Sequence, residues 1–145
     1  MKYVTHYAKK YVLSTIGTNV SYNALTVPVY GDVPSNASLP YITVYSVAQD
    51  DLDRNSDDFS YEANLRVEVV TSFGRGFQDS SACEIITSDA LTLIRPTPSS
   101  TLDMSADSLN NYAIDLLATN IIKEEYPDNI YIRAITDLVF WIEEV

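Results

Sequence analysis

The feature that most constrains the fold is a run from Phe59 to Thr71 in which apolar and polar side chains alternate. The apolar or aromatic positions are Phe59, Tyr61, Ala63, Leu65, Val67 and Val69. The positions between them are Ser60, Glu62, Asn64, Arg66 and Glu68. A period of two residues is typical of a β-strand with one face on a core and the other in water. The run therefore predicts a strand, which we place at the centre of an antiparallel sheet.

Other segments predict two helices and further strands. The predicted helices are Tyr3–Ile16 and Phe77–Ile94, and the predicted strands, besides Phe59–Thr71, are Thr26–Tyr30, Tyr41–Val47 and Ile130–Ile142. Gly17 and Arg95-Pro96 provide the expected helix ends. Because Pro28 lies inside Thr26–Tyr30, that segment fits an edge strand. Gln49–Asp58 is expected to be an acidic loop joining two strands as a hairpin, and Pro96–Ser108 a second loop.

The segment Leu109–Glu125 fits two patterns. Residues with helical spacing are Leu109, Tyr112, Ala113, Leu116 and Leu117, whereas Ile114, Leu116, Ala118 and Ile122 have strand spacing. We favour a strand for the second half, because Tyr126-Pro-Asp-Asn129 predicts a turn and the strand after that turn needs a partner. The choice between helix and strand stays open for Leu109–Ala118.

The expected fold is α+β, with a mainly antiparallel sheet flanked by two helices in the order α-β-β-β-α-β-β. A chain of 145 residues is the size of one ordinary domain, so we expect residues 1–145 to form a single unit.

Composition excludes some classes of function. The formal net charge is −11, which disfavours a surface that binds nucleic-acid phosphates. The one cysteine, Cys83, cannot form an internal disulfide or a cysteine-based metal site, and a buried hydrophobic role is expected. No apolar run is long enough to span a membrane, so we expect no membrane partner and synthesis in a cytoplasm.

Three motifs could carry chemistry, and each has a plainer interpretation. The acids from Asp51 to Glu62 are spaced nearly as in an EF-hand calcium loop, but Ser56 replaces the turn glycine and strands replace the flanking helices. A solvated hairpin loop is favoured. His6 lies on a lysine-rich helix face, where a catalytic base would lack an orienting carboxylate. Gly74-Arg-Gly76 is too short for a phosphate-binding loop. We expect no catalytic residue, cofactor or metal.

Four sequence segments together resemble the tail-terminator, or tail-completion, proteins of tailed bacteriophages. They are Val29-Tyr-Gly-Asp-Val-Pro34, Leu39-Pro-Tyr-Ile-Thr-Val44, Ser72-Phe-Gly-Arg-Gly76 and Tyr131-Ile-Arg-Ala-Ile-Thr-Asp-Leu-Val-Phe140. The resemblance covers most of the chain. The chain departs from the family pattern in the loops at Asp50–Asp58 and Pro96–Ser108. It implies a tail-terminator-like fold and a non-enzymatic structural protein of the virion tail or neck, assembled in the host cytoplasm. The alternatives are a neck or connector ring subunit of a short-tailed phage and a small cellular binding module.

The resemblance also implies partners. They are further copies of the chain, in a ring of six or twelve, portal, connector or tail-tube proteins, and DNA that only passes through the lumen. A closed ring needs two different complementary patches on each subunit. The sequence offers a basic helix face and an acidic loop for these patches: Lys2, Lys9, Lys10 and Leu13 on the first, and Asp50, Asp51, Asp53, Asp57 and Asp58 on the second.

Overall fold

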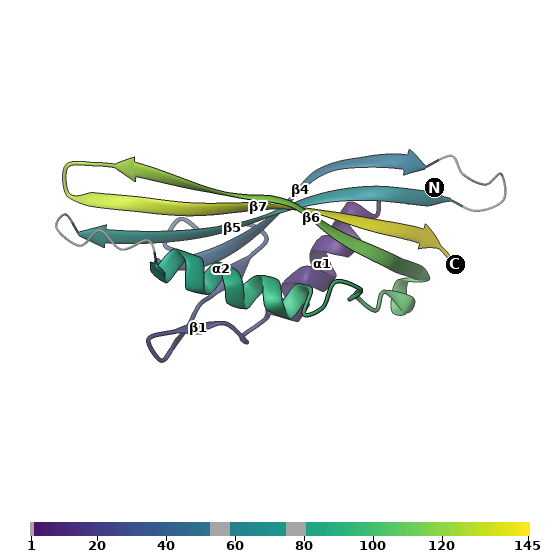
Figure 1. Cartoon of the computed structure of the whole chain (residues 1–145), viewed down its shortest axis with the longest axis horizontal. Helices are drawn as coiled ribbons and strands as arrows, with labels where there is room; N and C mark the ends of the chain where they lie inside the picture. Colours follow the sequence, from purple (N-terminus) through teal and green to yellow (C-terminus); the bar gives the residue numbers. More distant parts are fainter. Residues whose placement is uncertain (1, 53–58, 75–80) are drawn as a thin grey trace.

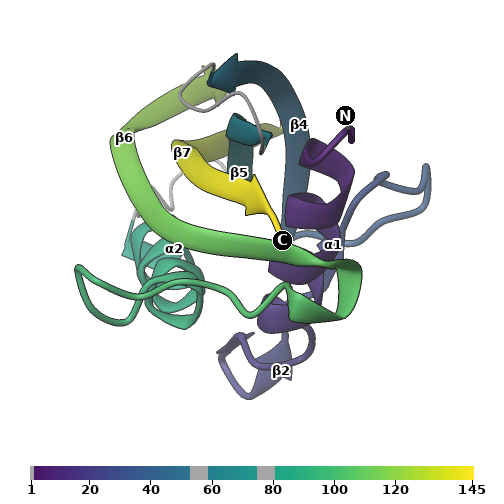
Figure 2. The ribbon, with the colours of Figure 1, turned by 90° about the vertical axis from the view of Figure 1, so that its right-hand side faces the viewer.

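The protein is described by a computed structural model that covers residues 2–52, 59–74 and 81–145. Two helices and a five-stranded sheet form two layers, with both helices on one face of the sheet (Figures 1 and 2). The helices are α1 (Thr5–Ile16) and α2 (Ser81–Ile94). The large sheet contains β3 (Val29–Tyr30), β4 (Tyr41–Leu52), β5 (Ser60–Gly74), β7 (Asn129–Glu144) and β6 (Leu109–Glu125), in that spatial order. The α+β class is therefore confirmed.

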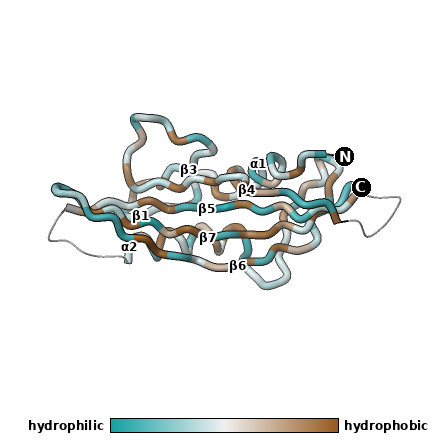
Figure 3. Tube along the Cα trace, turned by 90° about the horizontal axis from the view of Figure 1, so that it is seen from above, coloured by the Kyte–Doolittle hydropathy of each residue, from teal (hydrophilic) through white to brown (hydrophobic). Residues whose placement is uncertain are grey.

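The predicted central strand is the middle strand of this sheet. β5 pairs antiparallel with β4 on one side and with β7 on the other, and β7 pairs antiparallel with β6. Figure 3 shows β4, β5, β7 and β6 side by side. The pair β3–β4 is parallel. Both predicted hairpin pairs, β4–β5 and β6–β7, are thus present in a mainly antiparallel sheet.

Several boundaries differ from the sequence prediction. Helix α1 begins at Thr5 rather than Tyr3, and the part of the second predicted helix before Ser81 lies outside the described residues. Strand β4 runs on to Leu52, because its last residues pair with β5 from Ser60 to Asn64. All of Leu109–Glu125 is strand, which settles the open segment. A 3-10 turn, η1 (Ser105–Asp107), precedes it.

The predicted strand Thr26–Tyr30 is wrong as a single element. Leu25–Thr26 is β2, which pairs with β1 (Ser21–Tyr22) in a separate small hairpin, and only Val29–Tyr30 joins the large sheet. Pro28 separates the two because it has no N–H to donate, although its carbonyl accepts a hydrogen bond from Ile42 N at 2.9 Å. The hairpin turn has positive φ at Asn23 and Ala24, a conformation that sequence normally signals with glycine. The observed element order therefore differs from the predicted one.

The core lies between the helices and the apolar face of the sheet. Helix α1 buries Ala8, Val12 and Ile16, and helix α2 buries Ile86 and Ala90. The sheet side includes Tyr61, Leu65, Val67, Ile132, Leu138 and Phe140. Cys83 is buried, as expected, and its thiol lies 3.6 Å from the carbonyl oxygen of Val69. Burial raises the pKa of this thiol, so it acts as a small apolar side chain.

Phe140 gives a direct test of this core. It is fully buried on β7, where its neighbours across the ladder are Ala63 on β5 and Ile114 on β6. Because deletion of a buried aromatic ring leaves a cavity, Phe140→Ala should lower the free energy of unfolding by about 3–5 kcal/mol. Denaturant unfolding measures this change. Tyr3→Ala, at an exposed ring, is the control and should have little effect; equal losses in both variants would contradict this core.

Candidate assembly interface

The outer edge of β6 carries the most prominent exposed apolar surface. β6 is the last strand of the sheet, so one of its backbone edges has no strand partner among the described residues. Its exposed large apolar residues are Tyr112, Leu116, Leu117, Ile121 and Ile122, with Leu117 at 63% exposure. The segment from Leu116 to Ile122 contains no charge. Uncharged, β-forming segments on a free edge promote association between chains unless a partner covers them.

A groove lies on the helix side of this edge. It encloses about 380 Å³ between α2 and the face of β6 and β7. Leu91 and Ile94 of α2 form one wall, and Leu116, Ile121 and Leu138 line the sheet side. Glu84, in the first turn of α2, and Arg95, just beyond its last residue, are the charged lining residues. The groove therefore continues the exposed apolar surface of β6.

The opposite edge of the sheet is also partly open. β3 pairs with β4 only at Ile42 and Thr43, so β4 has no strand partner on its outer side from Val44 to Leu52 in the described structure. A register shift lies between Ser46 and Ala48, and Val47 at this bulge is 51% exposed. β6 has a comparable shift between Leu116 and Ala118, at the exposed Leu117. Both edges thus present an exposed apolar residue at a bulge.

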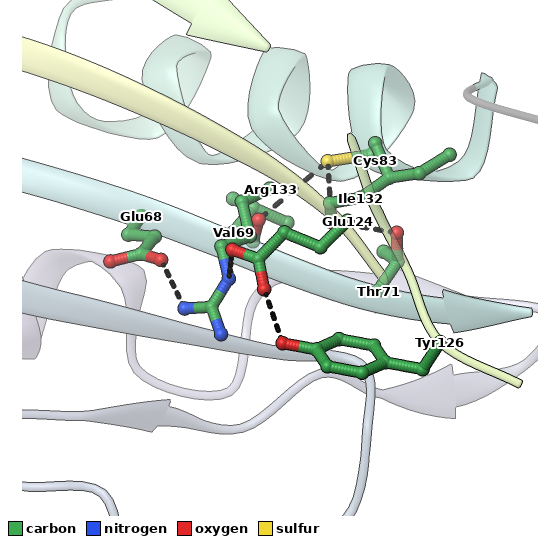
Figure 4. A network of polar contacts seen from close by, with 8 residues as sticks. All are labelled: Glu68, Val69, Thr71, Cys83, Glu124, Tyr126, Ile132 and Arg133. Atoms are coloured by element: carbon green, nitrogen blue, oxygen red, sulfur yellow. Dashed lines mark hydrogen bonds and ion pairs between the residues drawn. The ribbon is translucent and has the colours of Figure 1, made fainter. Parts of the chain in front are cut away.

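The face of the sheet without helices carries ion pairs and an excess of acids, set among apolar residues such as Val70, Ile135 and Val139. Arg66 forms an ion pair with Asp137 at 2.9 Å. Arg133 pairs with Glu68 at 2.8 Å and Glu124 at 3.2 Å, and Tyr126 donates a hydrogen bond to Glu124 at 3.0 Å (Figure 4). The Glu68 contact raises the pKa of Arg133. Further acids alternate onto this face at Asp50, Glu62, Asp115 and Glu143. Both arginines are neutralised, so carboxylates determine the charge of this face.

The predicted basic patch is engaged within its own chain. The Nζ of Lys2 donates to the carbonyl oxygen of Asp107 at 3.1 Å, and that of Lys9 donates to Gly31 O at 3.3 Å. Lys10 forms an ion pair of 3.0 Å with Asp107, although its side chain stays 60% exposed. Leu13, which was expected on the basic helix face, is half-buried and packs against the core cluster. Lys10 is therefore the exposed member of the patch, whereas Lys2 and Lys9 are half-buried.

The predicted acidic loop is only partly described. Asp50 and Asp51 are exposed on β4, whereas Asp53, Asp57 and Asp58 lie outside the described residues. The segment Asp51–Glu62, whose acids are spaced nearly as in an EF-hand loop, is flanked by β4 and β5 rather than by helices. Among residues 2–52, 59–74 and 81–145, no group of three or more His, Cys, Asp or Glu side chains is placed to hold a metal.

The structure also shows where His6 lies and whether a helix could cross a membrane. His6 is exposed, and its ring lies 3.9 Å from that of Tyr7, measured between centroids. No helix in the described part of the chain has the length and apolar content needed to cross a bilayer.

The sequence prediction missed the edge of β6 and its groove. The uncharged run from Leu116 to Ile122 was the signal that could have identified them.

No family model matches the chain, and no curated protein matches it significantly.

The contact between α1 and η1 predicts a pH dependence. Tyr11 donates to Asp107 Oδ2 at 2.6 Å, which raises the pKa of Tyr11 to about 12; this bond and Lys10 hold the pKa of Asp107 below its usual value. A carboxyl group with a depressed folded-state pKa stabilises the fold above its unfolded pKa and loses that contribution as pH falls through the folded value. Asp107→Asn should therefore lower the melting temperature at neutral pH and have a smaller effect at about pH 2.

Thermal unfolding followed by circular dichroism at the two pH values measures this difference. Asp89→Asn, at an exposed position of α2, is the matched control. An Asp107→Asn loss that is as large in acid as at neutral pH would contradict the assigned contact.

Proposed function

We propose that this protein is a structural subunit of a tailed-bacteriophage virion, forming a ring at the head–tail junction or the tail end. The observation that carries the proposal is the exposed, uncharged segment Leu116–Ile122 on a free sheet edge beside an apolar groove. Such a surface fits a protein partner better than a small polar substrate, because it offers apolar area and unpaired backbone groups. The role is assembly rather than catalysis.

The distribution of charge supports a ring around DNA. The helix-free face carries more carboxylates than arginines, and both arginines are paired with acids. A wall of like charge repels phosphate and lets DNA pass without binding. The helix-free face therefore lines the lumen in this proposal, and the helices lie outside. The sequence phrases that resemble tail terminators favour the tail end, and the same ring fits the neck of a short-tailed phage.

Purified protein tests the assembly part of the proposal. Sedimentation velocity should show a discrete oligomer, and electron microscopy should show rings of six or twelve copies with a central opening. In purified particles of the phage that encodes the chain, antibody labelling should mark the neck or the tail end. If purified particles lack the protein, the virion role is wrong, whatever state the free protein adopts.

A further inference from the structure

We infer that the free edge of β6 in one copy pairs antiparallel with the free edge of β4 in the next copy, and that this brings Lys9 of the next copy to Glu84. The inference rests on the proposed ring and names the contact that closes it. The unsatisfied backbone groups of an edge strand select another extended strand as their partner. Within this chain, the described part of the sheet offers two such edges, one on each side.

Strand direction allows this pairing to repeat. Each of the contacts β4–β5, β5–β7 and β7–β6 is antiparallel, so β4 and β6 run in opposite directions. A second copy placed beside the first in the same orientation therefore presents β4 antiparallel to β6. One sheet then continues from copy to copy, and a closed ring leaves neither edge exposed. A two-fold pairing of β6 with β6 would cover one edge and leave Tyr45 and Val47 of β4 in water.

The strand edges alone bury too little area for a specific interface. The open part of β4, Val44–Leu52, is about 30 Å long, and a sheet about 10 Å deep gives roughly 600 Å² in total over the two copies. A specific interface needs about 1,000 Å² or more. The remainder has to come from the helix side of the sheet, where the groove between α2 and β6 meets α1 and β3 of the next copy.

The ladder registers place complementary charges at that point. Ile121, Ala134, Val69 and Ile42 lie at one level across the sheet. Glu84 lies near this level, because it follows Cys83, whose Sγ is 3.6 Å from Val69 O. At the other edge, Lys9 binds Gly31 O, next to Tyr30, which pairs with Thr43. With neighbouring copies at the same height, Glu84 of one copy and Lys9 of the next differ by about two residues, roughly 7 Å, along the strand direction. Both side chains are long enough to span this offset.

Two edge variants test the pairing. Leu117→Lys places a charge on the β6 edge and Val47→Lys on the β4 edge, and both positions are exposed in the single chain, so folding should be preserved. Each variant alone should associate more than about tenfold more weakly than the parent, because the new charge would be desolvated in the contact. Mixed one to one, the variants retain one intact β6 edge and one intact β4 edge, so sedimentation should show heterodimers and nothing larger.

The control is Leu25→Lys, at an exposed apolar residue of β2 away from both edges, and it should assemble like the parent. The inference is overturned if Val47→Lys assembles normally or forms β6-paired dimers alone, or if the mixture stays monomeric. A parent protein that remains monomeric at high concentration also overturns it. The virion role would still be judged separately, by the labelling of particles.

Exchange of charges tests the predicted ion pair. Lys9→Glu and Glu84→Lys should each weaken assembly at low salt, and the double variant should restore it. Asp89→Lys is the matched control, because Asp89 is exposed on α2 and does not line the groove. If the parent forms rings but the double variant does not recover assembly, the Lys9–Glu84 contact is wrong, although the ring itself stands.

Discussion

The pairing of β5 with β7 is the interaction on which the rest of the structure depends. Their ladder runs without a register shift from Ser60 opposite Glu143 to Gly74 opposite Asn129. Side chains on one side of this ladder, such as Leu65 and Phe140, form the floor on which both helices pack. Those on the other side hold the ion pairs Arg66–Asp137 and Arg133–Glu68. A one-residue slip would exchange the two faces, burying charge and exposing the core. The alternating pattern therefore fixes both the register and the separate roles of the two faces.

The two outer strands differ from this regular centre in their bulges and in their exposed apolar residues. Both β4 and β6 contain bulges, and at the bulges they expose Val47 and Leu117. Bulges, prolines and charges usually protect the edges of sheets. Here the charged residues lie outside the uncharged segment of β6, at Asp115 before it and Lys123 after it. Exposed apolar residues on a strand of seventeen residues are stable if another subunit covers them. The proposed ring would therefore explain an edge that favours aggregation in an isolated protein.

The sequence predicted the strands in which apolar and polar residues alternate clearly. The alternation in Phe59–Thr71 and Ile130–Ile142 identified the two central strands, because each has one face on the core and one in water. Leu109–Glu125 was harder, since its apolar residues lie on both faces of an edge strand and leave no clear period. The turn at Asn23-Ala24 lacks the usual glycine, so its hairpin was missed. The basic patch was predicted from sequence, but the contacts of its lysines, such as Lys10–Asp107, depend on folding that joins residues far apart in sequence.

The proposed assembly requires that another copy of the chain cover the outer edge of β6. Amide hydrogen exchange of the segment Leu116–Ile122, followed as the protein is concentrated from monomer to its assembled form, tests this claim most directly. We predict that exchange in this segment and in the Val44–Leu52 part of β4 slows together on assembly, while the β1–β2 hairpin is unchanged. If assembly leaves the exchange of both edge segments at the monomer rate, the subunits meet elsewhere and the account is wrong.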